Sequence, residues 1–244
     1  DLICAIATPA AQTVANVTSD IPIVATAVTD YKTAKLVKDD AKPGTNVTGT
    51  TDMNPVAEQL DLLLKLVPNA KTIGTIYCSS EVNSQLQVEL LKKAAAAKGI
   101  TVKEATVSTV NDIQQAARSL AGDVQAVYVP TDNVLASAIP TLISVTEEAK
   151  LPVICAEGGM VRAGGLATLG VDYYKLGFQT GVMAADILSG KAKPADMAIQ
   201  AQKEFKPTIN LKEAAKIGLK VPEDLLKGAE AVSYTHLRAH ETSQ

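Results

Sequence analysis

Short apolar runs and stretches of mixed polarity alternate along most of the chain. The apolar runs are rich in β-branched and aliphatic side chains and predict strands at residues 2–7, 21–25, 72–78, 101–107, 124–129 and 152–156. Between most of these runs, apolar residues recur every three or four positions, which is typical of amphipathic helices. Strand, helix and strand in succession predict βαβ units, and therefore a parallel sheet with helices on its faces.

The predicted helices have recognisable boundaries. They cover residues 56–67, 82–97, 113–120 and 173–188, and a short final helix starts at Asn210 with Glu213 in its first turn. Asn54 and Pro55 are expected to begin the first of them, as cap and first-turn proline. Asp172 and Gly190 are expected to bound the fourth. Residues 194–207 predict an irregular connection.

Composition agrees with a folded α/β protein. The 244 residues are enough for one large or two modest domains, and 47% of them are hydrophobic, which excludes a disordered chain. Aromatic residues make up 3% and there is no Trp, so the core must be packed from small and branched side chains. Such side chains suit strands that are buried on both faces of a parallel sheet.

Charge and hydropathy exclude two classes of partner. Lys and Arg number 23 against 26 Asp and Glu, and the net charge of −3 favours neither nucleic acid nor an anionic membrane surface. The sequence also contains no apolar run of about 18 residues, the length that a transmembrane helix needs.

Both ends of the chain are unusual. The first residues read at once as a buried strand, with no initiator Met or signal peptide, which indicates a fragment cut upstream. Residues 232–244 have no apolar period and contain both histidines, His236 and His240. This segment is predicted to pack on nothing, as a non-native or disordered tail; a frayed native end is the alternative.

Several kinds of catalytic site are excluded by missing residues. Without the tail the chain has no histidine, which removes Ser-His-Asp triads, Cys-His pairs and His-ligated zinc. Cys4, Cys78 and Cys155 are an odd number without CxxC spacing, and each lies in an apolar run, so buried free thiols are expected. GxGxxG, GxxxxGK[ST] and GxSxG motifs are absent, and we expect neither a cofactor nor a metal.

Small polar residues follow four predicted strands directly. These segments are residues 8–12, 79–83, 130–133 and 156–159. Loops at the carboxyl ends of parallel strands line the ligand crevice, and helix N-termini there offer NH groups to anions. The hydroxyls, amides and carboxylates of these loops suit a small polar ligand. The alternative is that they only cap the following helices.

The order and spacing of short motifs carry a resemblance to a known family. The motifs are ATPAAQ at 7–12, PGTNVTG at 43–49, SSEVNS at 79–84, PTDN at 130–133, AEGG at 156–159, GVDYY at 170–174 and INLK at 209–212. Each motif is weak alone, but together they cover residues 1–228. The chain resembles the solute-binding proteins of bacterial ABC importers, in the branch that includes tryptophan and tyrosine binders.

The resemblance implies a type I periplasmic-binding-protein fold, with two α/β lobes joined by three crossing segments. Residues 1–48 and 171–197 would form a partial N-terminal lobe, 49–170 and 198–228 the C-terminal lobe, and 229–244 the tail. The crossings are expected near 44–49, 167–172 and 195–205. About two upstream βα units of the first lobe would be missing.

The resemblance also implies a function. The protein would act outside the cytoplasm, attached to the membrane only through a lipid anchor on the missing N-terminus. It would bind an amino acid-like ligand, with aromatic ones the first to test, and deliver it to an ABC permease. The α-carboxylate would lie near Thr8, Ala10, Thr26 and Val28, and the α-ammonium near Asp132 and Glu157. Further candidate ligand-binding residues are Ser79, Ser80, Asn83 and Asn133.

Two other functions fit the same scaffold. The effector-binding domain of a transcriptional regulator can share this fold. An α/β enzyme would use Asp132 and Glu157 as general acid and base, although no nucleophile, metal set or cofactor loop accompanies them.

Overall fold

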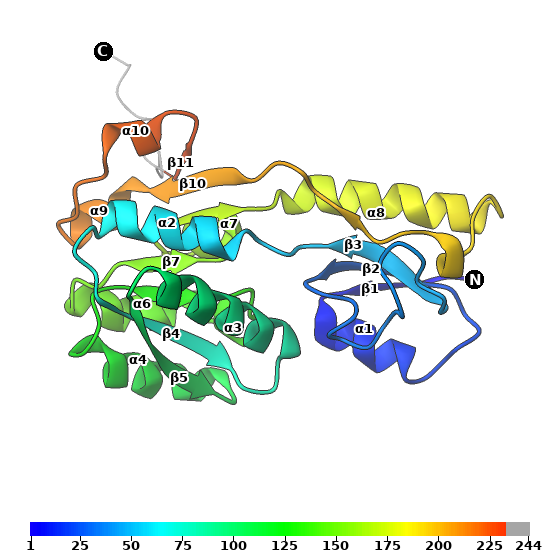
Figure 1. Ribbon diagram of the computed structural model, residues 1–244, viewed down its shortest axis with the longest axis horizontal. Coiled ribbons are helices and arrows are strands. Elements are labelled where there is room, and N and C mark those ends of the chain that lie inside the picture. The colour runs from blue at the N-terminus through cyan, green and yellow to red at the C-terminus, as the bar shows by residue number, and fades with distance from the viewer. Residues whose placement is uncertain (233–244) are drawn as a thin grey trace, which may run out of the picture.

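Two lobes, each built on its own sheet, make up the computed structural model, which describes residues 1–232 (Figure 1). A four-stranded sheet has the order β1-β2-β3-β9, and a seven-stranded sheet has the order β11-β10-β8-β7-β6-β4-β5. Every pairing is parallel except that of β8 with β10. The prediction of an α/β protein with helix-flanked parallel sheets is confirmed.

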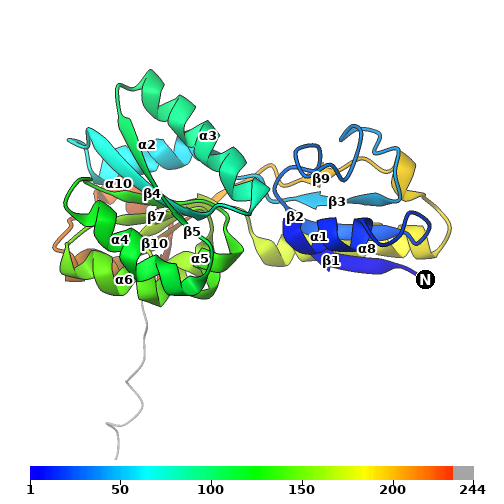
Figure 2. The same cartoon turned by 90° about the horizontal axis from the view of Figure 1, so that it is seen from below.

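The smaller lobe is a three-layer unit. Its strands are β1 (Ile3–Ile6), β2 (Ile23–Val28), β3 (Val47–Thr51) and β9 (Gln200–Ala201). Helix α1 (Thr8–Ala15) covers one face of the sheet and α8 (Tyr173–Leu188) the other (Figures 1 and 2). Val24 of β2 packs against Met183 and Ala184 of α8. This lobe therefore combines the start of the chain with a helix from its last third.

The larger lobe carries most of the chain. Its strands are β4 (Thr72–Cys78), β5 (Thr101–Val107), β6 (Val127–Val129), β7 (Val153–Cys155), β8 (Ala167–Gly170), β10 (Lys206–Asn210) and β11 (Glu230–Val232). Its helices are α2 (Val56–Leu66), α3 (Val82–Ala97), α4 (Ile113–Ala121), α5 (Asn133–Ser137), α6 (Ile139–Glu148), α7 (Gly158–Arg162), α9 (Leu211–Lys216) and α10 (Glu223–Leu226).

Alternate residues of the central strands enter separate cores on the two faces of the larger sheet. Val127 and Val129 of β6 belong to one apolar cluster, and Tyr128 between them belongs to the other. Because side chains alternate across a strand, a strand buried on both faces has to be apolar throughout. This explains why β6 and β7 read as continuous apolar runs in the sequence.

Three crossing segments join the lobes, at residues 52–55, 171–172 and 202–205. Asn54 Oδ1 accepts a hydrogen bond from Val171 N at 3.3 Å, which ties the first crossing to the second. Gln202 ties the third to the second, because its amide both accepts from and donates to the backbone of Asp172. The expectation that Asn54 caps α2 is wrong, since Pro55 is the N-cap residue and no side chain caps that helix.

Sheet membership changes slightly later than the predicted domain boundaries. Strand β3 keeps residues up to Thr51 in the smaller sheet, and β9 keeps Gln200 and Ala201 there. Residues 44–46 therefore lead into β3, residues 47–49 belong to it, and the first crossing follows it. The division into residues 1–48 with 171–197 and 49–170 with 198–228 stays a prediction.

Other differences concern strands that the apolar pattern missed. Strands β3, β8 and β10 are rich in Thr and Gly or contain Pro, and β10 lies partly in the predicted irregular connection. Strand β11 pairs with β10 although it falls in the predicted tail of 229–244; residues 233–244 lie outside the described part of the chain. All three cysteines are free, but Cys4 is exposed, on the opposite face of the edge strand β1 from the buried Ala5.

An apolar row remains exposed on the smaller lobe. Tyr174, Phe178 and Val182 recur every four residues on the outer side of α8, with exposures of 84%, 70% and 50%. Ile6 on the edge strand β1 is 68% exposed. Such surfaces are usually covered by another element. The absence of upstream βα units remains a prediction.

Gly49 provides a test of the packing between β2 and β3. A Cβ at this position would lie 1.8 Å from Ala25 O and 2.5 Å from the Tyr31 hydroxyl, and Gly49 has a φ of +150°. We expect Gly49→Ala to lower the free energy of unfolding by about 2 to 4 kcal/mol, measured by urea denaturation. Gly181→Ala in α8 is the matched control, since its Cβ would meet nothing within 4 Å; it should be neutral or stabilising by up to about 1 kcal/mol. Equal midpoints for both variants would contradict this packing.

Candidate functional site

A cavity of about 490 Å³ lies between the two lobes. The carboxyl ends of β1 and β2 supply Ile6, Thr8 and Thr26 to one wall, and the segments after β6 and β7 supply Asp132 and Glu157 to the other. Asp52 of the first crossing segment also lines the cavity. The prediction that loops at the carboxyl ends of the strands converge on one crevice is therefore confirmed in its geometry.

On the smaller lobe, α1 begins at the cavity wall and has free NH groups in its first turn. The N-cap residue, Ala7, lines the cavity and makes no side-chain cap, and the helix begins at Thr8. The first-turn NH groups of Thr8 and Ala10 therefore have no carbonyl of a preceding turn to bond, while Pro9 has no NH. Together with the helix dipole, these groups make a favourable position for an anion.

Backbone strain is concentrated on the same wall. Ala7 has a φ of 72° and Ala27 a φ of 55°, values that are rare for residues other than glycine. Ala7 directly follows β1, Ala27 lies near the end of β2 where its pairing with β3 is irregular, and both line the cavity. Unfavourable backbone conformations of this kind persist where surrounding contacts enforce them, and they cluster at ligand sites.

Asp132 lies on the opposite wall with its carboxylate largely occupied. It is the N-cap residue of α5 and accepts from Leu135 N at 2.9 Å, Cys78 N at 2.6 Å and the Ser84 hydroxyl at 2.8 Å. Only 1% of the residue is exposed. Burial raises the pKa of Asp132, which these hydrogen bonds partly oppose and the charge of Glu81 reinforces. The carboxylate holds β4, α3 and α5 together.

Glu157 has more acceptor capacity left than Asp132. It caps the short helix α7 by accepting from Gly159 N at 2.5 Å and Met160 N at 2.6 Å, and 9% of the residue is exposed. Because an ionised carboxylate offers about four lone-pair sites, two of them remain for another donor. Both predicted carboxylates thus cap helices, as the alternative interpretation held, and both line the cavity.

Asp52 is a third carboxylate in the cavity wall, and sequence reasoning missed it. It is fully buried in the first crossing segment and accepts from the Tyr173 hydroxyl at 2.7 Å and the Thr29 hydroxyl at 3.0 Å. Burial raises the pKa of Asp52, and these two hydrogen bonds partly oppose the shift. Burial and the nearby Asp52 charge also raise the pKa of Tyr173. The missed signal is that Asp52 follows a strand, β3, whose Thr-rich sequence did not predict one.

The other predicted site residues divide into two groups. Asn83, at the start of α3, and Asn133, at the start of α5, line the cavity. Residues outside the cavity lining are Ala10, Val28, Ser79 and Ser80, of which Val28 is buried and the other three are exposed.

The electrostatic character of the cavity is one-sided. Its lining includes Asp52, Asp132 and Glu157, and among the described residues that line it there is no Lys, Arg or His. Within residues 1–232, no three His, Cys, Asp or Glu side chains cluster so that they could hold a metal ion. The wall formed by the larger lobe therefore suits a cationic group that donates hydrogen bonds.

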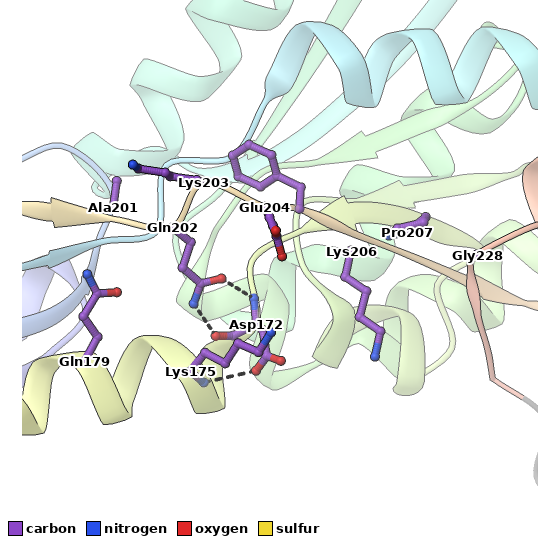
Figure 3. Close-up of a pocket in the computed structure, with 11 residues that line it drawn as sticks. Asp172, Lys175, Gln179, Ala201, Gln202, Lys203, Glu204, Lys206, Pro207 and Gly228 are labelled. Atoms are coloured by element: carbon purple, nitrogen blue, oxygen red, sulfur yellow. Dashed lines mark hydrogen bonds between the residues drawn. The ribbon is translucent and has the colours of Figure 1, made fainter.

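A second hollow, of about 570 Å³, lies along the crossing segments (Figure 3). Lys175, Lys203 and Lys206 line it, and so do Gln202 and Asp172, which two hydrogen bonds join (Figure 3). It is an open groove beside the joint between the lobes.

None of the helices in residues 1–232 combines the length and apolar character that crossing a bilayer requires.

Comparison with known proteins identifies the family. The model of the family "ABC transporter substrate binding protein" matches residues 1–233. The tyrosine-binding protein of Clostridioides difficile is 47% identical over 192 residues, which are 79% of this chain and 56% of that protein. The chain thus spans little more than half the length of this relative.

Solved structures show the same relationship. The ABC domain from Streptococcus pneumoniae in complex with L-Trp is 43% identical, with a TM-score of 0.91 over 95% of this chain and 78% of that one. The ligand-free, open structure of a substrate-binding protein with adhesive properties from Clostridium difficile is 44% identical over the same shares, with a TM-score of 0.72. The fold is therefore that of the periplasmic binding proteins, as the resemblance implied.

Likeness to transcriptional regulators is limited to the fold. A LacI family regulator from Bifidobacterium animalis is 13% identical, with a TM-score of 0.56 over 84% of this chain and 74% of that one. Proteins of the matching family bind substrates and are not enzymes, so the expectation of a binding protein is confirmed. The chain belongs to the ABC transporter substrate-binding protein family.

Proposed function

We propose that this protein binds an amino acid with an aromatic side chain between its lobes and delivers it to the permease of an ABC importer. It would work outside the cytoplasm, held at the membrane by a lipid anchor on an upstream segment. Support for the ligand class comes from a relative named as a tyrosine-binding protein and from another solved with L-Trp. Support for the transport role comes from the family.

The observation that carries the proposal is the opposite polarity of the two cavity walls. The smaller lobe presents NH groups at the start of α1, and the larger lobe presents Asp132 and Glu157. A free amino acid carries an α-carboxylate and an α-ammonium on one carbon. Each charged group of such a ligand would thus meet a wall of complementary character.

The cavity also has room and apolar surface for the ligand side chain. Its volume of about 490 Å³ lies within the range of roughly 300 to 1,000 Å³ that is usual for small-molecule sites. Ile6, Ala136 and Met160 give it apolar contacts from both lobes. Thioether sulfur makes favourable contacts with aromatic rings, so Met160 suits an aromatic side chain.

The arrangement of the lobes supports binding by closure. Over equal shares of the chain, the TM-score is 0.91 with the L-Trp complex and 0.72 with the ligand-free, open relative, at nearly equal identity. The lobes therefore sit as in the liganded relative. Closure would remove both ligand charges from water together, and the ligand would favour the closed state by its extra contacts there. The permease would then recognise that state.

Glu157→Gln tests the ammonium contact. Loss of one charged acceptor should weaken L-tyrosine or L-tryptophan binding by about 1.5 to 3 kcal/mol, measured by calorimetric titration. Glu148→Gln is the matched control, an exposed glutamate of α6, and should bind like the wild type. Asp132→Asn is a poorer probe, because an amide NH₂ cannot accept from Cys78 N and the Ser84 hydroxyl. Equal affinities of wild type and Glu157→Gln would remove Glu157 from the site.

The raised carboxyl pKa values predict how affinity depends on pH. As pH falls from neutrality through the raised pKa values of Asp52 and Asp132, these groups take up protons and lose their charge. An amino acid stays zwitterionic there, so its affinity should fall at a pH above the usual aspartate range of about 4. Titrations at constant ionic strength measure this. An affinity that stays constant down to about pH 4 would contradict a binding role for the two charges.

A further inference from the structure

Asn83 is buried, with only 3% of the residue exposed, and yet one of its polar atoms has no hydrogen-bond partner. Its side chain lies at the start of α3 and lines the cavity between the lobes. The amide NH₂ donates to Glu81 Oε2 at 2.9 Å and to Thr131 O at 2.8 Å, with Ser84 Oγ at 3.3 Å. Oδ1 has no partner among the described residues. A buried acceptor left in this way is destabilising, so it calls for an explanation.

Glu81 determines which way the Asn83 amide faces. Rotating the amide by 180° would place Oδ1 against Glu81 Oε2 and Thr131 O, which are both acceptors without a hydrogen to share. The observed orientation therefore commits both NH₂ hydrogens to the protein. It leaves Oδ1 as the only polar atom of this side chain available to a ligand.

Glu81 also acts on the neighbouring loop. Its carboxylate accepts from Asn133 N at 3.1 Å, from the Asn133 amide at 2.7 Å and from Val134 N at 3.3 Å, all at the start of α5. Although Glu81 is the N-cap residue of α3, it makes no side-chain cap to that helix. Its negative charge thus offsets the positive ends of two helices, which would otherwise favour an anion on this wall.

We propose that Asn83 Oδ1 accepts a hydrogen bond from the ligand's ammonium group, and that Glu81 is a positioning residue that keeps this acceptor free of protein donors. The proposal rests on the amino acid-binding function proposed above and specifies which protein group binds the ammonium. Glu157, across the same wall, would accept a second hydrogen of the same group. The site would then select a charged donor at the α-position.

The consequence is selectivity against ligands that lack the amine. A ligand with the same side chain and carboxylate but no ammonium would leave Asn83 Oδ1 unpaired in the closed protein. A site built to hydrogen-bond a polar ligand group rejects analogues without it strongly, because its own buried group then stays unsatisfied. The wild type should therefore bind L-tyrosine much more tightly than 3-(4-hydroxyphenyl)propanoate.

The test compares these two ligands on variants of the protein by calorimetric titration. Asn83→Leu should weaken L-tyrosine binding about 10- to 100-fold, and change the affinity for 3-(4-hydroxyphenyl)propanoate by less than about 3-fold. Glu81→Gln should weaken L-tyrosine binding on the order of 10-fold and likewise leave the affinity for 3-(4-hydroxyphenyl)propanoate nearly unchanged. If Asn83→Leu does not fold, the Glu81→Gln variant provides the comparison. The controls, Asn111→Leu and Glu148→Gln at exposed positions, should leave both affinities unchanged.

Each result has a defined meaning. Equal weakening of both ligands by Asn83→Leu and Glu81→Gln would show that the pair only supports the fold, and would overturn the proposal. Unchanged affinities for both ligands would overturn it as well. A wild type that binds neither L-tyrosine nor L-tryptophan would instead overturn the proposed function. Circular dichroism and thermal melting of each variant establish that the folded protein is being compared.

Discussion

The joint between the lobes is the constraint on which the rest of the structure depends. Two separate sheets can form one site only if their carboxyl edges face each other at a fixed position. Hydrogen bonds between the crossing segments provide this, through Asn54 with Val171 and Gln202 with Asp172, and Asp52 adds one from the Tyr173 hydroxyl at the start of α8. Each contact joins segments more than 29 residues apart in the chain.

Asp52 shows why this joint also belongs to the site. A buried carboxylate is costly in its charged form unless donors surround it, and Asp52 has the Thr29 and Tyr173 hydroxyls. It lines the cavity as well. A cation bound there would offset the remaining cost of burying its charge, so ligand binding and the geometry of the crossing segments act on the same group.

The helix caps around the cavity explain how one fold gives two walls of opposite character. Helix α1 has no side-chain cap, so its first-turn NH groups stay free where the helix begins at the cavity wall. Helices α5 and α7 are capped by Asp132 and Glu157, and their NH groups are already paired. Capping thus adds negative charge on one wall and withholds it on the other. Capping and ligand binding are compatible roles, because a carboxylate can accept more than one donor.

Much of the fold was predictable because it depends on local sequence patterns, namely the apolar periods of strands and helices and the residues that cap helices. Strands β4 and β5 and helix α8 have the predicted bounds, since their apolar periods and the caps at Asp172 and Gly190 are unambiguous. Strands β3 and β8 were missed, because Thr and Gly read as loop residues although both strands are stabilised by pairing within a sheet. The location of the site followed from the same patterns, but Asp52 did not, since its loop follows an unrecognised strand.

The sequence by itself determined the α/β class, five of the ten α-helices in residues 1–232 and the edge of each sheet at which polar residues gather. These properties depend on side-chain periodicity and caps, which act over a few residues. Only the tertiary structure decided that Asp52 lies in the cavity wall, that Asn54 joins two crossings instead of capping α2, and that Glu81 orients Asn83. Those outcomes depend on which donor meets which acceptor after distant segments pack, and no local pattern encodes that meeting.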